Sequence, residues 1–145
     1  MKKFTKLLSL LLVMALAISV VACSSYGKVE KAIEELGFTV VESEKQAEEY
    51  KDEEKITNVH VFEKSVGLIK DYVIVLEFKS TEKMIEYYKE SDTLKGLVSD
   101  ISKNEDVKAI HAKLEETGFA CDNCLIVPSL LNVLDVTAKI AELNK

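Results

Sequence analysis

The sequence has 145 residues, of which 48% are hydrophobic and 30% are charged. This is the composition of a folded globular protein, because disordered chains combine low hydrophobicity with high net charge. All 19 basic residues are lysines, so the chain has no guanidinium group to bind a phosphate in bidentate fashion, which disfavours phosphoryl-transfer chemistry.

The N-terminal segment combines three features of an export signal. Lysines at 2, 3 and 6 make its start cationic, residues 7–22 are uncharged, and small residues precede Cys23. The apolar stretch is shorter than the roughly 20 residues that cross a bilayer. We therefore expect residues 1–22 to be a signal peptide and not a permanent membrane-spanning helix.

Residues 20–23, Val-Val-Ala-Cys, resemble the lipobox of bacterial lipoproteins. The resemblance covers only residues 1–23, and it departs from the commonest pattern in having Val20 where leucine is usual. It implies that Cys23 receives diacylglycerol, with acyl chains such as palmitate, and becomes the first residue of the mature protein. The chain would then be held at the outer, extracytoplasmic face of a bacterial membrane. The alternative is an ordinary secretory signal cut after Ala22, which would leave Cys23 as a free thiol.

Removal of the signal peptide leaves 123 residues, a length that fits one domain over 28–145, joined to Cys23 by a tether over 24–27. Three of the 19 lysines are lost with the signal, so 16 basic side chains remain against 25 acidic ones, a net charge of −9. This charge repels nucleic acids and anionic lipid headgroups. We expect no nucleic-acid partner, membrane contact through the lipid anchor, and a membrane-proximal partner.

The first half of the domain is predicted from its periodicity. Residues 28–36 have helical spacing and end at Gly37, which suits a left-handed helix cap. Residues 38–42 predict a strand, and residues 44–55, which are almost wholly charged, predict a solvent-exposed helix. Strands around 59–62 and over 71–78 would pair through the loop that contains Gly67.

Helical patterns dominate the residues that follow. Ser80 or Thr81 is placed to cap a helix that contains 84–88. Apolar residues over 94–101 follow the full i, i+3, i+4, i+7 pattern of a second helix. Residues 102–105 have the spacing of a capping box, and they precede a third helix that continues to Gly118.

The C-terminal part is predicted to hold one short strand and one helix. Residues 124–127 predict a strand, which Pro128 would end. A helix that begins at Ser129 is apolar around much of its circumference. We expect it to be packed in the core, and the alternative is that it offers a surface to a second protein.

From residue 38 onward, the predicted order is strand, helix, two strands, helix, strand and helix. This order predicts an α+β fold, a single small domain with a mixed or antiparallel sheet of about four strands packed with helices. It is compatible with a ferredoxin-like arrangement that has an added C-terminal helix.

Cys121 and Cys124 form the one motif with candidate chemistry. In an exported protein such a pair can form a reversible disulfide, remain as inert thiols or contribute to a metal site. The motif precedes a predicted strand, whereas thioredoxin-type activity needs the first thiol at a helix N-terminus, and Asp122 raises thiol pKa values. A Cys2His2 zinc site would need His60 and His111, which lie on separate elements. We predict no metal site, no cofactor and no catalytic residue.

These observations predict a membrane-anchored envelope lipoprotein whose domain is a non-enzymatic binding or accessory module for an envelope protein or peptide. The alternative is a thiol–disulfide redox protein that uses Cys121 and Cys124.

Overall fold

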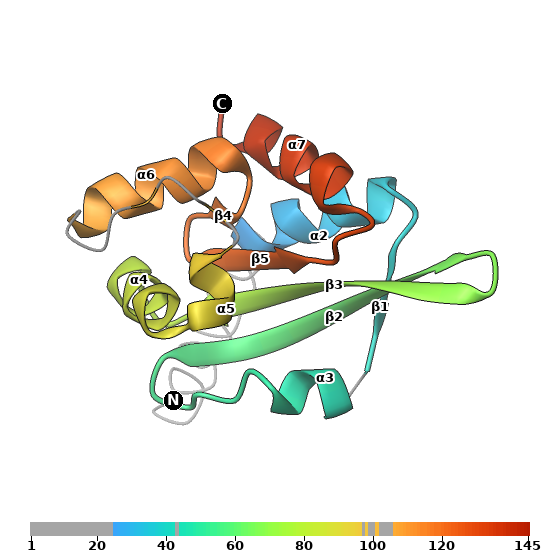
Figure 1. Cartoon of the computed structure of the whole chain (residues 1–145), viewed down its shortest axis with the longest axis horizontal. Coiled ribbons are helices and arrows are strands. Elements are labelled where there is room, and N and C mark those ends of the chain that lie inside the picture. The colour runs from blue at the N-terminus through green and yellow to red at the C-terminus, as the bar shows by residue number, and fades with distance from the viewer. Residues whose placement is uncertain (1–24, 43, 97, 99–100, 102–105) are drawn as a thin grey trace, which may run out of the picture.

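The computed structural model describes residues 25–42, 44–96, 98, 101 and 106–145. They form an α+β domain around one five-stranded sheet, with the strands in the spatial order β1-β2-β3-β5-β4 (Figure 1). Every pair of neighbouring strands is antiparallel. The predicted α+β class is therefore confirmed, with an antiparallel sheet of five strands where about four were expected.

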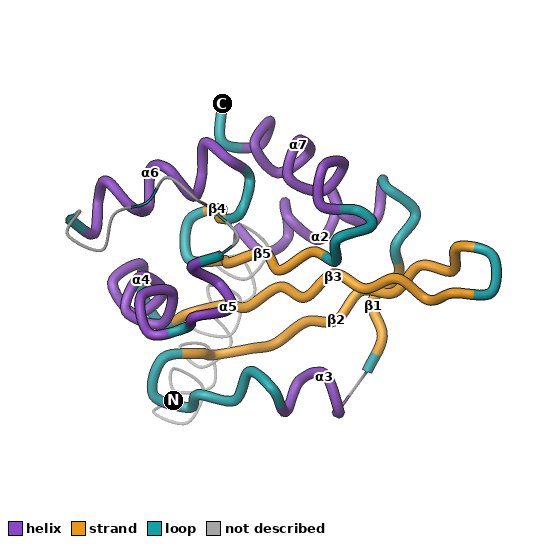
Figure 2. The backbone as a smooth tube through the Cα atoms, viewed as in Figure 1, coloured by secondary structure: helices purple, strands orange, loops and turns teal. Residues whose placement is uncertain are grey.

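The strands are β1 (Thr39–Val41), β2 (Ile56–Val66), β3 (Ile69–Phe78), β4 (Ala120–Cys121) and β5 (Cys124–Pro128). As predicted, β2 and β3 pair through a tight turn at Gly67, where φ is +64°. This long hairpin extends past the rest of the sheet (Figure 2). Pro128 ends β5, in agreement with its predicted place at a strand terminus. The sequence did not predict β4, since two residues carry no periodicity.

The helices are α2 (Ser25–Glu35), α3 (Glu44–Glu48), α4 (Thr81–Glu90), α5 (Asp92–Lys95), α6 (Val107–Thr117) and α7 (Val133–Leu143). Ser80 caps α4 as predicted, because its hydroxyl accepts a hydrogen bond of 3.2 Å from the Lys83 N–H. Among the helices of the described residues, none has the length and apolar character that a membrane crossing would need.

Helices cover both faces of the sheet, because β3 is apolar on both of its faces. Val73 and Val75 pack with α2 and α7, whereas Leu76 and Phe78 pack with α4 and α6. This explains the nearly continuous apolar run over 71–78, which is typical of a central strand buried on two sides.

The ferredoxin-like arrangement is wrong. In the structure β1 lies at the edge of the sheet and pairs antiparallel with β2, the next strand in the sequence. A ferredoxin-like fold would need a parallel crossover between them, and such crossovers take a dozen or more residues, usually with a helix that packs across the sheet. The intervening α3 has only five residues.

Three predicted helices also differ from the structure. The helix expected over 44–55 ends at Glu48, and the one expected over 94–101 is reduced to α5, with Val98 and Ile101 outside any helix. The capping box over 102–105 lies outside the described residues, and Asp106 caps α6 in its place. The last helix begins at Val133 and not at Ser129.

Candidate functional site

The two cysteines lie opposite each other in the hairpin formed by β4 and β5. Cys121 and Cys124 are paired across the ladder, and the turn between them uses a positive φ of 51° at Asp122. Directly opposite residues in an antiparallel ladder have Cα atoms about 4.5–5.5 Å apart, within the range that a disulfide bridges. Both thiols are free and buried.

Contacts from three other elements hold this hairpin in place. The His111 ring of α6 is hydrogen-bonded through Nε2 to the Asp122 carbonyl at 2.8 Å, and the Glu115 carboxylate accepts from the Asp122 N–H at 3.1 Å. The Asn123 amide donates to the Phe78 carbonyl at 2.8 Å. The Ser25 hydroxyl donates to the Asp122 carboxylate, so the start of α2 adjoins the cysteine hairpin.

The surroundings of the thiols suppress their reactivity. Burial, followed by the charges of Asp122 and Glu115, raises the pKa of Cys121 to about 11. Burial and the nearby Glu77 raise the pKa of Cys124 further. The thiolate is the nucleophilic form of cysteine, so these pKa values disfavour a thioredoxin-type attacking role. Asp122 has the effect on the pKa of Cys121 that the sequence predicted, but burial is the larger cause.

A polar cluster borders the hairpin on the same face of the sheet. His60 is hydrogen-bonded through Nε2 to the Glu77 carboxylate at 2.8 Å, and Glu77 is the cross-strand neighbour of Cys124. Tyr26 of α2 stacks on the His60 ring, with centroids 3.7 Å apart. The hydrogen bond from His60 lowers the pKa of Glu77. This cluster connects α2 to the sheet.

The two histidines do lie near the cysteine hairpin, although they come from different elements. The Nε2 atom of each ring is already hydrogen-bonded, that of His60 to Glu77 and that of His111 to the Asp122 carbonyl. Within the described part of the chain, no group of three or more histidine, cysteine or acidic side chains is arranged to hold a metal ion. The geometry therefore gives no support to a Cys2His2 zinc site.

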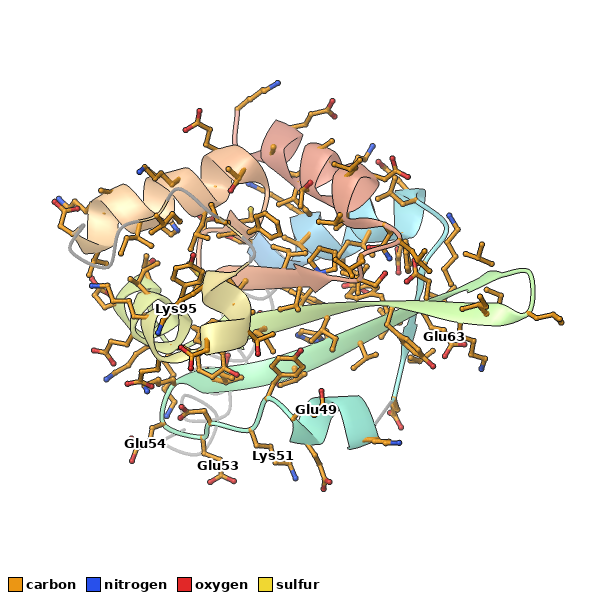
Figure 3. The ribbon with its side chains drawn as sticks, viewed as in Figure 1. Glu49, Lys51, Glu53, Glu54, Glu63 and Lys95 are labelled. Carbon is orange, nitrogen blue, oxygen red and sulfur yellow. The ribbon has the colours of Figure 1, made fainter. Side chains whose placement is uncertain are left out.

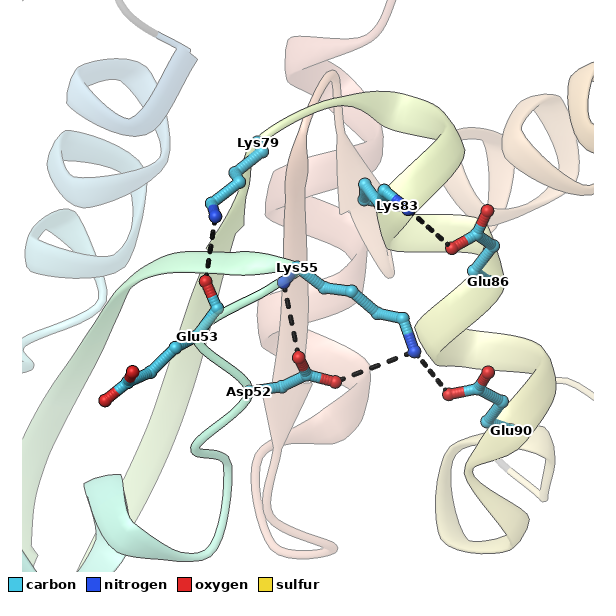
Figure 4. Close-up of polar contacts among 7 residues, drawn as sticks. All are labelled: Asp52, Glu53, Lys55, Lys79, Lys83, Glu86 and Glu90. Carbon is cyan, nitrogen blue, oxygen red and sulfur yellow. Dashed lines mark hydrogen bonds and ion pairs between the residues drawn. The ribbon is translucent and has the colours of Figure 1, made fainter.

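Polar contacts attach the charged segment over 44–55 to α4 and to Lys79, the residue that follows β3. Lys55 contacts Glu90 of α4 at 2.5 Å and Asp52 at 3.6 Å, and the Lys79 ammonium donates to the Glu53 carbonyl at 2.8 Å (Figure 4). The Glu53 and Glu54 side chains point outward (Figure 3). These contacts fix the loop before β2, and we assign them no role in binding.

Most of the exposed large apolar side chains come from two regions, the tip of the β2–β3 hairpin (Val66, Leu68 and Ile69) and the residues that lead into α7 together with its first turn (Leu130, Leu131 and Leu134). We call these six residues the distal apolar surface, because Leu36, just past the end of α2 opposite the Ser25–Asp122 contact, lines one cavity with Val66 and Leu131. Leu130, Leu131 and Leu134 are 91%, 72% and 81% exposed. Only part of the C-terminal apolar segment is therefore core, with Val136 and Ile140 buried.

A cavity of about 290 Å³ lies between the two parts of this surface. Its apolar wall includes Leu36, Phe38, Val66 and Leu131, and its polar wall includes Asp71 and Asn132. A volume near the lower end of the roughly 300–1,000 Å³ range of ligand pockets suits one side chain better than a large cofactor.

Buried polar groups form the polar wall of the cavity. The Asp71 carboxylate is 4% exposed and accepts hydrogen bonds from the Ser129 hydroxyl and from the Asn132 Nδ2, the latter at 2.5 Å. Asn132 is 7% exposed, and its Oδ1 has no hydrogen-bond partner among the described residues. Asn132 precedes α7, but its side chain does not cap the helix.

The sequence prediction missed Asp71, Ser129 and Asn132. Up to 61 residues separate the members of this cluster along the chain, so no local motif joins them. One signal was present, since Asp71 is an acidic residue at the start of the mainly apolar run over 71–78.

Comparisons with protein-family models, with curated proteins and with solved structures find no match to this chain. The fold alone defines the chain as a small α+β domain with an antiparallel sheet. Any function must be argued from its own residues.

Proposed function

We propose that this chain is a bacterial lipoprotein, anchored through Cys23 to the outer face of a membrane, whose domain binds an envelope protein or peptide without catalysing a reaction. The observation that carries the binding role is the distal apolar surface. Monomeric proteins rarely expose a large apolar patch unless it serves an interaction, and Leu130, Leu131 and Leu134, which are close together in the sequence, are each at least 72% exposed. The unactivated thiols agree with a role that does not depend on catalysis.

The position of α2 supports presentation of this surface to a partner. Ser25 begins α2 only two residues after Cys23, whereas Leu36, one residue past the end of the helix, lines the cavity. Eleven residues of α-helix span about 16 Å. Ser25 and the cavity residue Leu36 therefore lie at opposite ends of α2, so an anchor at Cys23 would hold the end of the helix that is away from the cavity. The expected tether over 24–27 is shorter, because the helix already begins at Ser25.

Lipid attachment is tested by intact-mass analysis of the membrane-extracted protein and by fractionation of cells that produce it. We expect the mature chain to begin at Cys23 with diacylglycerol added, and a Cys23→Ser variant to leave the membrane fraction. An unmodified chain, or recovery of the unaltered protein as a freely soluble species, would contradict the anchor.

Binding is tested by photocrosslinking in the same cells. A photoreactive residue in place of Leu130 should give a discrete adduct, and one in place of Glu116 on α6 serves as the control outside the surface. The adduct should be lost when Leu134→Ser is added. Adducts of equal yield from both positions, or an adduct insensitive to Leu134→Ser, would refute a specific role for the distal apolar surface.

A second candidate function, thiol–disulfide exchange, is favoured by one observation, the cross-ladder pairing of Cys121 and Cys124. In such a step the two thiols would form one disulfide and lose two protons and two electrons, which reduce a disulfide of the partner to two thiols. The test is the mass of the full chain after equilibration in glutathione buffers of graded potential. Redox function requires a reversible change at physiological potentials, and a pair that stays in one state throughout would exclude it.

A further inference from the structure

Asn132 lines the cavity, and its buried Oδ1 has no hydrogen-bond partner among the described residues. Its Nδ2 donates to the Asp71 carboxylate, and this bond fixes the orientation of the amide, since the flipped amide would place two oxygens against each other. An asparagine at this position usually caps the helix that follows with its Oδ1, but Asn132 makes no such bond. A buried acceptor without a partner is costly, so a ligand that donates a hydrogen bond would gain by reaching it.

The charges of the cavity favour a cation over a neutral donor. Two carboxylates, those of Asp71 and Asp135, line it with one ammonium, that of Lys64, so negative groups outnumber positive ones. The Lys64 ammonium donates to the Leu36 carbonyl at 2.8 Å and keeps its charge. Lys64 also lies over the Phe38 ring, 5.5 Å from its centroid. The mature chain carries a net charge of −9, which attracts cations and repels anions at longer range.

The lining of the cavity favours a cation on an aliphatic stem. Leu36, Phe38, Val66 and Leu131 supply apolar lining, and Asp71, Asn132 and Asp135 supply polar lining. A lysine side chain matches this division, because its methylene groups pack on apolar surface while its ammonium donates three hydrogen bonds. Leu131 also lines the cavity and is largely exposed, so its side chain is free to move when a ligand enters.

From these observations we infer that the cavity receives a lysine side chain of a cationic, amphipathic peptide segment, whose apolar residues lie on the distal apolar surface. The lysine ammonium would bind Asn132 Oδ1 and the carboxylates of Asp71 and Asp135. This inference rests on the proposed binding function and specifies the chemistry of the partner.

The test uses the full lipidated chain in nanodiscs of phosphatidylcholine, with empty nanodiscs as the blank for lipid binding. The probes are four soluble peptides that differ at one position, which holds lysine, norleucine, Nε-acetyl-lysine or glutamate between two leucines. Fluorescence anisotropy gives the affinity of each. The lysine peptide should bind at least about tenfold more tightly than the norleucine peptide, because only lysine supplies charge-assisted hydrogen bonds.

Matched variants locate the binding site. Asp135→Asn should weaken the lysine peptide about threefold, the effect of one solvent-exposed charge pair, and leave the norleucine peptide unchanged. Asp92→Asn on α5 makes the same change away from the cavity and should affect neither peptide. Leu131→Ser should weaken both peptides, since it removes part of the shared apolar wall.

Equal affinities for the lysine and norleucine peptides would overturn the inference but leave an apolar binding surface in place. Absence of binding by any peptide, tighter binding of the glutamate peptide, or a concentration-dependent dimer that occludes the surface would also overturn it. None of these results would affect the photocrosslinked adduct at position 130, which is expected to be lost when Leu134→Ser is added. That adduct tests the proposed function separately. Failure of the inferred chemistry can thus be distinguished from failure of the proposed function.

Discussion

The carboxylate of Glu77 lies between the His60 ring and the cysteine hairpin. Its pKa is lowered chiefly by the hydrogen bond from His60, so its charged form stabilises the folded chain. A carboxyl group with a lowered pKa in the folded state contributes stability above its unfolded pKa of about 4.3, and that contribution is lost as the pH falls through the folded pKa.

We expect Glu77→Gln to lower the free energy of unfolding by about 1 kcal/mol at pH 7, a value reduced for partial solvent screening. At pH 3 and below, the difference from the unaltered chain should shrink towards zero, because Glu77 is then increasingly protonated in both states. Urea unfolding at a series of pH values measures this. The exposed Glu116→Gln is the control, and a difference for Glu77→Gln that does not depend on pH would contradict the stabilising role of the charge.

The environment of Cys121 leads to a second prediction about a single residue, the reactivity of its thiol. With a pKa of about 11, its thiolate fraction at pH 8 should be roughly 100-fold below that of an exposed cysteine. Alkylation of the reduced, folded chain by iodoacetamide should therefore be slower than that of the urea-unfolded chain by a factor of this order. Rates within a few-fold of each other would show that the thiols are accessible and reactive, and would favour the redox alternative.

At the scale of elements, the turn between α6 and β4 depends on Gly118. Its φ is +84°, and a Cβ atom at this position would lie 1.8 Å from the Thr137 carbonyl oxygen of α7. Because Gly118 has no Cβ atom, α6 and α7 can pack closely against each other near the cysteine hairpin. Gly67 at the hairpin tip has a similar φ of +64°, but a Cβ there would meet no atom within 4 Å.

These two glycines form a matched pair for mutation. Gly67→Ala should cost about 1 kcal/mol, the effect of left-handed backbone alone, whereas Gly118→Ala should cost at least about 3 kcal/mol, because the helices must also separate. Thermal and urea unfolding of both variants provide the measurement. Equal costs would show that the approach of α7 to Gly118 does not limit packing.

Elements with strong periodicity could be predicted from the sequence, and those that depend on distant contacts could not. The long β3 strand follows from its apolar run, and the start of α4 follows from Ser80. By contrast, the pattern over 94–101 is helical in spacing, yet the structure ends α5 at Lys95, just before Gly96. The order of the strands depends on pairings such as β3 with β5, for which the sequence carries no local signal.

The same distinction applies to the two candidate sites. The cysteine pair is visible in the sequence because both thiols fall within one tight turn. The cavity is not, because Asp71 of β3 meets Ser129 and Asn132 only when the C-terminal segment crosses the end of the sheet. The apolar helix predicted from Ser129 suggested either core or partner surface, and tertiary packing buries Val136 and Ile140 but leaves Leu130, Leu131 and Leu134 exposed.

For the whole molecule, α2 separates Ser25 from the distal apolar surface, and in the proposed lipoprotein the residues between Cys23 and Ser25 would set how far that surface reaches from the bilayer. The Ser25 side chain donates an exposed hydrogen bond to Asp122, so we expect that residues inserted before Ser25 leave the domain folded. Tether length can therefore be changed without altering the domain, which makes it a direct probe of whether the partner is membrane-proximal.

Insertion of ten Gly/Ser residues between Ser24 and Ser25 should leave the unfolding temperature and the membrane fraction unchanged. The linker adds an average reach of about 17 Å and lets the domain reorient, which lowers the effective concentration of the distal apolar surface at a partner held at the bilayer. The yield of the photocrosslinked adduct at position 130 should fall, whereas the same insertion after Lys145 should not change it. An unchanged yield with the longer tether would place the partner in free solution, because a soluble partner reaches the surface at any distance from the membrane.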